Sequence, residues 1–531
     1  MRVAVLTLVL YSLGLYSPTG LFAQSPKYDL VITGGKIVDG SGDPWFYGDI
    51  GIQGDTITAI GKLDPASATR HLDAKGLIVA PGFIDIHTHA RRGIVLDPAA
   101  QNYTRQGVTT VMEGPDGSAP LPIAKFLADI GALRLGPNFG TFAGQGTIRE
   151  QVMGLVNRPA TPAEIEKMRQ ITRQAMLDGA FGVTTGLFYV PGNFSSTEEV
   201  IELEKVVGAM GGMHHSHQRD DSAKVLDSVR ETIRIGEEGG LPTQITHHKI
   251  IGKDNWGLSK ETLRLVEEAR ARGVDVTIDQ YPYTASSTGT AALIPQWAQE
   301  GGQKALVERL DAPEQRAKIK AMVIENIKFD RGGGDPKNVV LANCNFDKTL
   351  AGKNLAEITQ AHGRDVTLDN AAETLLELQH SGGCQAVYHA ISEEDVERIL
   401  KYPFTMVGSD GEVPQFGVGA PHPRSYGTFA RILARYVRER HIITLEDAVH
   451  KMSGLPAQRL KLYDRGLIRP GMKADIAVFD PNTVADLATF EKPHQYAIGF
   501  KHVLVNGKPL IADGALTSER SGRILYGPAK Q

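Results

Sequence analysis

The chain has 531 residues and 41% of them are hydrophobic, which is enough for a large core and more than one domain. Its 57 basic and 61 acidic residues give a net charge of -4, so composition offers no electrostatic case for binding nucleic acid or an anionic membrane. Beyond the N-terminus, no run approaches the roughly 18 consecutive apolar residues of a membrane span, so none is expected.

The first residues predict a cleavable secretory signal. Arg2 precedes an apolar run at 3–10, and small residues follow near Ala23. We therefore expect residues 1–23 to be a signal peptide and the mature protein to be periplasmic or secreted; the alternative is a disordered apolar N-terminus. Cys344 and Cys384 are the only cysteines. Two cysteines 40 residues apart predict no disulfide framework, even in an oxidising compartment.

Two segments at opposite ends of the chain have the pattern of short strands and turns. Residues 24–80 contain apolar runs at 30–35, 50–52 and 57–61, separated by Gly-Asp and Gly-Gly pairs. Residues 461–531 return to this pattern at 474–479 and 503–508. We predict that both segments build one small β-sandwich domain.

Residues 81–460 alternate strand-like and helical stretches, which indicates βα units and a parallel sheet. The candidate strands end at His89, Glu113, Gly144, Leu187, His217, His248, Tyr281 and Asp410. Eight such strands predict an α/β fold, a (β/α)8 TIM-like barrel. A charged helical stretch at 313–328 predicts an insertion of about residues 288–343 over the barrel mouth.

Histidines and an aspartate lie at the ends of these candidate strands. His87 and His89 are two positions apart on a strand, so both imidazoles point to the same side. His217, His247 and Asp410 belong to later strand ends. A lone His-x-His pair is more often a surface or core feature, but barrel strand ends line a single site. Because Zn²⁺ prefers imidazole, thiolate and carboxylate ligands, the set predicts a site for one or two zinc ions.

Such a site predicts a hydrolase. Zinc lowers the pKa of bound water towards neutrality and polarises a carbonyl group. Asp410 is placed to take the proton of the water and return it to a leaving amine. The possible substrates are amides, cyclic amides and esters.

Several motifs, in order along nearly the whole mature chain, resemble the D-aminoacylase (N-acyl-D-amino-acid deacylase) branch of the amidohydrolase superfamily. They are Gly-Leu-Phe-Tyr-Val-Pro-Gly at 186–192, Ser-His-Gln-Arg-Asp at 216–220, Thr-His-His-Lys at 246–249, Tyr-Pro-Tyr at 281–283, Gly-Ser-Asp-Gly at 408–411 and His-Pro-Arg-Ser-Tyr-Gly-Thr-Phe at 422–429. The resemblance implies that His217 and His247 bind the tighter metal ion, whereas His87, His89 and Asp410 surround a second, weaker position.

The resemblance also implies which residues hold the α-carboxylate of a small N-acyl amino acid substrate: Tyr189, Lys249, Tyr281 and Arg424. Arg offers a bidentate fork to a carboxylate, and Lys and Tyr add further donors. The alternatives are structural salt bridges for Lys249 and Arg424 and core packing for the two tyrosines.

Two departures from the family pattern concern the metal site. Family members usually carry a bridging Cys in a Gly-Asn-Cys-Gly loop after the second strand, and Asp116 stands at that position here. A carboxylate can bridge two metals but is a harder ligand than a thiolate. We favour Asp116, with Glu113 as the rival. In addition, Arg91 and Arg92 follow His89, where the family has acidic residues.

The sequence therefore predicts zinc-dependent hydrolysis of the amide bond of N-acyl-D-amino acids. The alternative enzyme is a cyclic-amide hydrolase or dipeptidase that uses the same metal site. The alternative from another class is a non-catalytic binding barrel, against which the retained Asp410 argues because a pure binder needs no positioned base.

Overall fold

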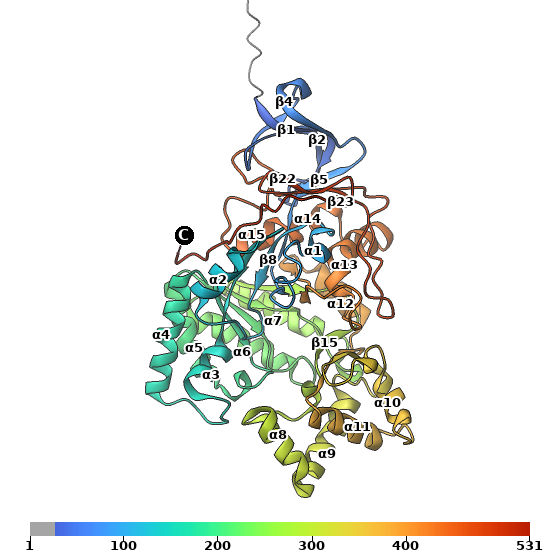
Figure 1. Cartoon of the computed structure of the whole chain (residues 1–531). Coiled ribbons are helices and arrows are strands. Elements are labelled where there is room, and N and C mark those ends of the chain that lie inside the picture. The colour runs from blue at the N-terminus through green and yellow to red at the C-terminus, as the bar shows by residue number, and fades with distance from the viewer. Residues whose placement is uncertain (1–26, 531) are drawn as a thin grey trace, which may run out of the picture.

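The computed structural model describes residues 27–530, which form a β domain, a barrel and an insertion into the barrel (Figure 1). The β domain lies at one end of the molecule, the barrel in the middle and the insertion at the other end. The expected signal at 1–23 lies outside the described residues. Within residues 27–530, we find no helix that combines the length and apolar character needed to cross a membrane.

The barrel has eight strand positions, as predicted. They are β6 (Phe83–Asp85) with β7 (Thr88–His89), β8 (Val108–Glu113), β9 (Asn138–Thr141) with β10 (Ala143–Gly144), β11 (Gly182–Gly186), β12 (Met213–His217), β13 (Thr243–Ile245), β14 (Val276–Gln280), and β18 (Thr405–Val407) with β19 (Gly411–Glu412). Neighbouring strands are parallel. The barrel closes where β19 pairs with β7 and the Asp410 amide donates to the His87 carbonyl (2.8 Å).

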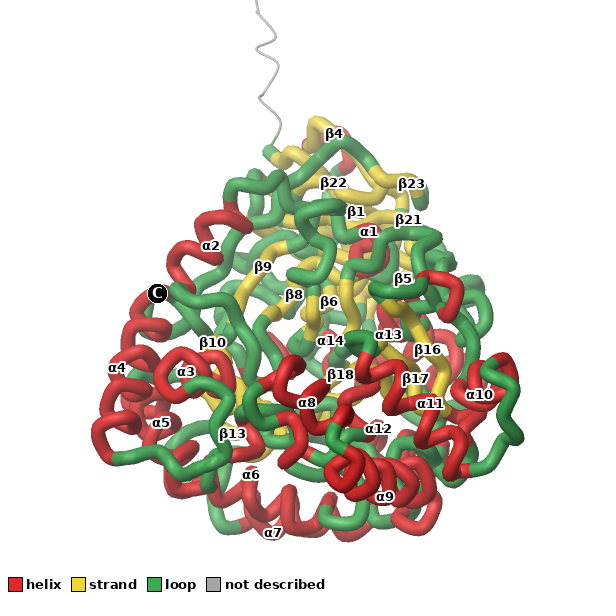
Figure 2. The backbone as a smooth tube through the Cα atoms, turned by 60° about the horizontal axis from the view of Figure 1, so that its bottom comes forward, coloured by secondary structure: helices red, strands yellow, loops and turns green. Residues whose placement is uncertain are grey.

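Helices cover the outside of these strands, and Figure 2 shows the strands in the interior. The helices are α1 (Gln101–Thr104), α2 (Ile123–Gly131), α3 (Gln145–Met153), α4 (Pro162–Asp178), α5 (Thr197–Ala209), α6 (Val225–Gly239), α7 (Ser259–Ala271), α12 (Glu393–Lys401), α13 (Arg424–Arg431), α14 (Leu445–Met452) and α15 (Gly454–Arg459). Local sequence fixes the ends of α4: Thr161 and Glu164 form a capping box, and Gly179 ends the helix at φ 114°. All six residues of β8 are buried, as expected of a strand covered on both faces.

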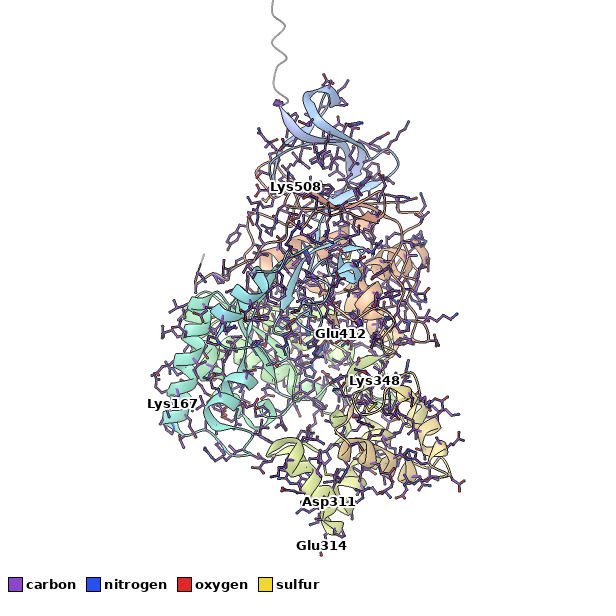
Figure 3. All side chains as sticks on the ribbon, viewed as in Figure 1. Lys167, Asp311, Glu314, Lys348, Glu412 and Lys508 are labelled. Carbon is purple, nitrogen blue, oxygen red and sulfur yellow. A yellow bond between two sulfur atoms is a disulfide. The ribbon has the colours of Figure 1, made fainter. Side chains whose placement is uncertain are left out.

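The β domain combines both ends of the chain. Its sheet contains β1 (Tyr28–Ile37), β2 (Phe46–Gln53), β3 (Thr56–Gly61), β4 (Ala68–Asp73), β5 (Ile78–Pro81), β20 (Ile476–Phe479), β21 (Phe500–Val505), β22 (Lys508–Ala512) and β23 (Ala515–Leu516). The pairing of β1 with β2 shifts register between Ile32 and Gly35. The first half of β1 also pairs with β4, and its last residues pair with β5. The sheet encloses a core to which both chain ends contribute, for example Ile50 and Ile476. Lys508 marks this domain in Figure 3.

The insertion between β14 and β18 is longer than the predicted 288–343. It has three antiparallel strands, β15 (Ser286–Gly289), β16 (Val339–Cys344) and β17 (Cys384–Tyr388). It also has four helices, α8 (Gly302–Asp311), α9 (Pro313–Phe329), α10 (Leu355–Ala361) and α11 (Leu368–His380). These elements share their own hydrophobic core, and Figure 3 shows Asp311 and Glu314 at the far tip. The sequence did not indicate that the insertion continues beyond residue 343. The two helices and the strand that follow have the same alternation as the βα units of the barrel.

The prediction that the two cysteines form no disulfide is wrong. Cys344 and Cys384 are bonded to each other, and their Cα atoms are 4.4 Å apart. They are direct partners in the antiparallel pair of β16 and β17, which brings their side chains within bonding distance. The sequence spacing gave no sign of this pairing because register depends on strands that are not adjacent in the chain.

Candidate active site

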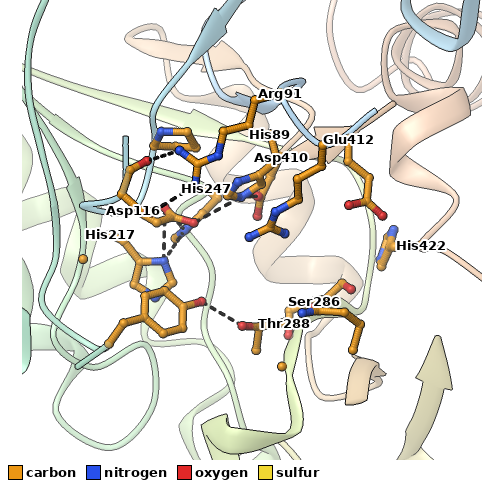
Figure 4. A pocket seen from close by; sticks show the side chains of 18 of the residues that line it. His89, Arg91, Asp116, His217, His247, Ser286, Thr288, Asp410, Glu412 and His422 are labelled. Atoms are coloured by element: carbon orange, nitrogen blue, oxygen red, sulfur yellow. Dashed lines mark hydrogen bonds and ion pairs between the residues drawn. The ribbon is translucent and has the colours of Figure 1, made fainter. Parts of the chain in front are cut away.

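A pocket of about 720 Å³ lies at the carboxyl ends of the barrel strands, between the barrel and the insertion (Figure 4). We call the metal-competent cluster at the pocket the barrel wall, which consists of His87, His89, Asp116, His217, His247 and Asp410. All of these except the fully buried His87 line the pocket. We call the facing side the insertion wall, which consists of Ser286, Ser287, Thr288, Gly289, Asn343 and Gln385. The barrel and the insertion, which carry the two walls, pack around separate hydrophobic cores.

The Asp116 carboxylate lies at the centre of the barrel wall. Its Oδ1 is 3.4 Å from His217 Nδ1, 3.4 Å from His247 Nε2 and 3.5 Å from His87 Nε2. Its Oδ2 is 3.3 Å from His89 Nε2. One carboxylate therefore reaches all four predicted histidines, the position that a ligand shared by two cations would occupy.

Asp410 approaches the same cluster from the other side. Its Oδ1 lies 3.1 Å from His89 Nε2 and 3.5 Å from His87 Nε2. Its Oδ2 forms an ion pair of 2.8 Å with Arg424 Nη1. One oxygen is thus anchored while the other faces the histidines.

Three residues of the barrel wall have left-handed backbone conformations: Asp116 at φ 56°, His247 at φ 34° and Asp410 at φ 50°. Such conformations are costly for residues other than glycine and persist only where the surrounding structure enforces them. Backbone strain is therefore concentrated where the ligand-type side chains converge.

The cluster keeps its carboxylates ionised. Burial raises the pKa of Asp116, but His217 and His87 outweigh burial and hold it well below its usual value. Burial also lowers the pKa of His87, and the nearby Asp410 and Asp116 carboxylates reverse this and raise it to about 9. For His217, burial and the neighbouring His247 lower the pKa to about 4. Negative oxygens and neutral nitrogen are the forms that bind cations.

Unpaired buried polar atoms are a second sign that the cluster fits a divalent metal ion. Several buried polar atoms of the cluster have no hydrogen-bond partner within residues 27–530: His87 Nδ1 and Nε2, His89 Nδ1, Asp116 Oδ1, His217 Nε2 and Asp410 Oδ1. Buried polar atoms normally have partners, and those that lack them point to an ion or water. Imidazole nitrogens with carboxylate oxygens are a donor set that suits zinc.

Glu113, the rival of Asp116, is turned away from the cluster. Its Oε2 accepts a hydrogen bond from the Arg91 amide (2.7 Å), and its Oε1 lies 3.6 Å from Arg91 Nη1. The structure thus brings Asp116 into the cluster and leaves Glu113 outside it.

The four predicted carboxylate-binding residues all line the pocket. Tyr189 shares a hydrogen bond of 3.0 Å with Thr288, and the hydroxyl of Tyr281 is buried without a partner among the described residues. The guanidinium of Arg424 lies 4.7 Å from the centre of the Tyr281 ring and donates to the Ser287 carbonyl (3.2 Å). Three donors therefore meet beside the insertion wall.

Lys249 is engaged in an ion pair. Its Nζ lies 2.9 Å from Asp221 Oδ2 and 2.8 Å from His247 Nδ1. Arg331, which the sequence did not single out, also lines the pocket and lies 3.8 Å from Asp221. Asp221 was missed as well, although it directly follows the Ser-His-Gln-Arg-Asp motif.

Asp279 was also missed, and it supports the cluster from beneath. Its Oδ1 accepts a hydrogen bond from the His247 amide (2.7 Å) and lies 3.6 Å from His87 Nδ1, and its Oδ2 lies 3.5 Å from His215 Nε2. A carboxylate in the fully buried strand β14 was the signal that could have indicated it. His248, the neighbour of His247, is buried outside the cluster and shares a hydrogen bond of 2.8 Å with Thr262.

The comparisons with known proteins agree with this geometry. The model of the Amidohydrolase family matches residues 392–511. The chain is 37% identical to a D-aminoacylase of Alcaligenes xylosoxydans xylosoxydans over 95% of its length and 98% of the relative. It belongs to the D-aminoacylase family of amidohydrolases. An N-acyl-D-glutamate deacylase of the same organism is also 37% identical, over 94% of this chain and 96% of the relative.

Solved structures of the family superpose along the whole fold. A D-aminoacylase crystal structure has a TM-score of 0.81 at 35% identity and covers 94% of this chain and 100% of its own. An N-acyl-D-glutamate deacylase of Bordetella bronchiseptica, complexed with zinc and a phosphonate inhibitor, has a TM-score of 0.79 at 34% identity, with the same coverage. A D-hydantoinase, at 16% identity and a TM-score of 0.56, shares the fold. The chain is therefore an amidohydrolase enzyme.

Proposed function

We propose that this enzyme uses zinc to hydrolyse the amide bond of N-acyl-D-amino acids, releasing a carboxylate and a D-amino acid. The observation that carries the proposal is the position of Tyr281 and Arg424, donors suited to an α-carboxylate, beside a cluster of metal-binding type. Family members named for D-amino-acid substrates support it.

His217 and His247 would hold one zinc ion, His87, His89 and Asp410 a second, and Asp116 would bridge them. Zinc supplies Lewis-acid polarisation of a carbonyl and lowers the pKa of water. Binding would displace the proton that the two carboxylates favour on His87, as metal binding to histidine generally does.

Asp410 has the features of the general base. Burial raises the pKa of its carboxyl group, but Arg424 and His87 outweigh burial and lower it well below its usual value, so the group is ionised at neutral pH. With Oδ2 held by Arg424, Oδ1, which faces His87 and His89, would accept a proton from water and return it to the leaving amine.

A substrate panel tests the proposal. N-acetyl-D- and N-acetyl-L-amino acids, the carboxamides of the same compounds, cyclic amides and unblocked dipeptides would be assayed with zinc-loaded and with chelated enzyme. We expect turnover of the D-acids only, and only with zinc. Equal turnover of neutral cyclic amides would favour the cyclic-amide hydrolase, and hydrolysis of unblocked dipeptides would favour the dipeptidase.

We also propose that the protein acts in the periplasm or outside the cell. The signal-like sequence at 1–23 supports this location, and the Cys344–Cys384 disulfide is a bond that persists in oxidising compartments. Fractionation of the native host, followed by N-terminal sequencing of the protein, tests both parts.

A further inference from the structure

Two arginines lie on the side of the pocket that the proposed carboxylate-binding residues leave free. Arg91 and Arg92 follow His89 and belong to the loop at 90–98, which we call the rim loop. Both line the pocket. Figure 4 shows Arg91 on one side of the cluster and Ser286 and Thr288 on the other.

The two arginines differ in how they are held. Arg91 Nη1 donates to the Ser118 carbonyl (2.7 Å) and Nη2 to the Ser118 hydroxyl (2.9 Å), and Glu113 accepts from the Arg91 amide. The Arg92 side chain, in contrast, is exposed and has no ion pair or hydrogen bond with any residue that the structure describes. An exposed cation that lines a pocket and has no partner of its own can receive an anionic group of a ligand.

The rim loop also presents an apolar side chain to the pocket. Leu96 of the rim loop also lines the pocket and is 76% exposed, so its apolar surface is available to a ligand. The carboxylates that line the pocket outside the cluster are Glu150, which is exposed, and Glu412, which Figure 4 shows near His422. The apolar side chain of Leu96 and the unpaired guanidinium of Arg92 together suit a ligand whose methylene chain ends in an anion.

The orientation of a bound substrate determines which of its groups lies near the rim loop. In the proposed function, Arg424 and Tyr281 would hold the α-carboxylate beside the insertion wall, and the amide would lie at the barrel wall. In a trans amide the two carbon chains leave on opposite sides of the C–N bond. The acyl chain is therefore directed away from the insertion wall and towards the rim loop.

We infer that the preferred acyl group is that of a short dicarboxylic acid, whose free carboxylate binds Arg92 while its methylenes lie over Leu96. The inference rests on the proposed deacylase function and specifies its substrate class. The reaction is unchanged: one water is consumed, the amide C–N bond breaks, the amine takes a proton, and the products are a dicarboxylate and a D-amino acid. A pocket of about 720 Å³ is in the range that holds drug-sized ligands, far larger than an acetyl group needs.

The test compares acyl chains of matched length on one D-amino acid. N-succinyl, N-glutaryl and N-adipyl substrates would be paired with the neutral N-butyryl, N-valeryl and N-hexanoyl substrates, using zinc-loaded enzyme. We expect at least one dicarboxylic member to have a kcat/KM about tenfold or more above its neutral partner, in line with a charge-assisted hydrogen bond. Free succinate and glutarate should inhibit competitively and more strongly than butyrate.

Variants identify the residue responsible. Arg92→Gln should raise KM for the preferred dicarboxylic substrate about tenfold and weaken inhibition by glutarate, while N-butyryl kinetics stay within about twofold. Arg92→Glu should reverse the preference. The matched control is Arg173→Gln, which removes an exposed arginine of α4 that has no ion pair among the described residues and lies outside the pocket.

The outcomes separate this inference from the proposed function. If N-acetyl- and N-butyryl-D-amino acids are turned over and the dicarboxylic series shows no advantage, or an advantage that survives Arg92→Gln, the inference is wrong and the deacylase function stands. If no N-acyl-D-amino acid is hydrolysed, both are wrong.

Discussion

The barrel wall and the insertion wall of the pocket are held in different ways. On the barrel wall, His87 and His217 are 0% and 3% exposed. His217 ends strand β12, His87 lies between β6 and β7, and Asp279 contacts His87 and the His247 amide. On the insertion wall, Asn343 and Gln385 face the pocket from an antiparallel pair that rests on a separate core and is closed by the disulfide. Because the insertion has its own core, substitutions in the insertion wall need not move the ligand-type side chains of the barrel wall. We therefore expect changes in the barrel wall to abolish catalysis, and changes in the insertion wall to alter substrate binding without altering zinc content.

The largest effect should come from metal removal. Chelation should abolish hydrolysis, and added zinc should restore it, because the cluster of ligand-type side chains is the only described group of this kind that lines the pocket. Activity and metal content would be measured together in the same samples. Full activity in rigorously metal-free enzyme would show that the barrel wall does not act in catalysis through a bound metal ion.

Asp410→Asn should lower kcat by roughly 10²–10⁴, the usual contribution of general acid–base catalysis. KM should change less, because the donors for the α-carboxylate are retained. The control is Asp129→Asn, which removes an exposed surface carboxylate paired with Lys125. Near-normal turnover of Asp410→Asn would exclude this residue as the proton shuttle.

Asp116→Ala and Glu113→Ala should differ in metal content. Asp116 reaches four histidines, so its loss should release most of the bound zinc. Glu113 contacts only Arg91 near the site, and the loss of such an outer contact typically weakens metal binding by about tenfold. Metal analysis of the two purified variants decides between them, and the opposite ranking would make Glu113 the bridging ligand.

Arg424→Gln should raise KM for N-acyl-D-amino acids by about 10- to 100-fold, since a hydrogen bond to a charged group contributes roughly 1.5–3 kcal/mol. Metal content should change little. The matched control is Arg431→Gln on the same helix, because Arg431 pairs with Asp486 outside the pocket. A variant with normal KM would show that Arg424 serves only as the partner of Asp410.

Replacing both cysteines by serine should give the smallest effect on catalysis. A disulfide that closes a loop of 40 residues stabilises a protein by roughly 4 kcal/mol through the entropy of the unfolded chain. We expect the insertion to unfold at a lower temperature, KM to rise a few-fold through Asn343 and Gln385, and zinc content to stay constant. Calorimetry and metal analysis check these points, and a loss of zinc would mean that the two walls are coupled.

The success of the sequence analysis differed between the two walls for a physical reason. His87 and His89 could be placed because a strand has a period of two residues and a barrel collects its strand ends. The pairing of Cys344 with Cys384 and the approach of Arg331 to the pocket depend on antiparallel contacts between segments distant in sequence, which periodicity does not encode. Asp279 lay within reach of sequence reasoning, since a carboxylate in a buried strand needs a partner.

The architecture of the β domain sets an order for folding. Strand β5 lies between β1 and β20 in the sheet, so a strand made early pairs with one made nearly 400 residues later. Contacts of such long sequence separation form slowly, because the closure of the intervening loop costs entropy first. During synthesis, β1 to β5 can pair with one another, but the second edge of β5 must wait for almost the entire chain. The domain can thus close only after the barrel is complete, and a chain truncated before β20 would expose the edge of β5, a hazard for aggregation.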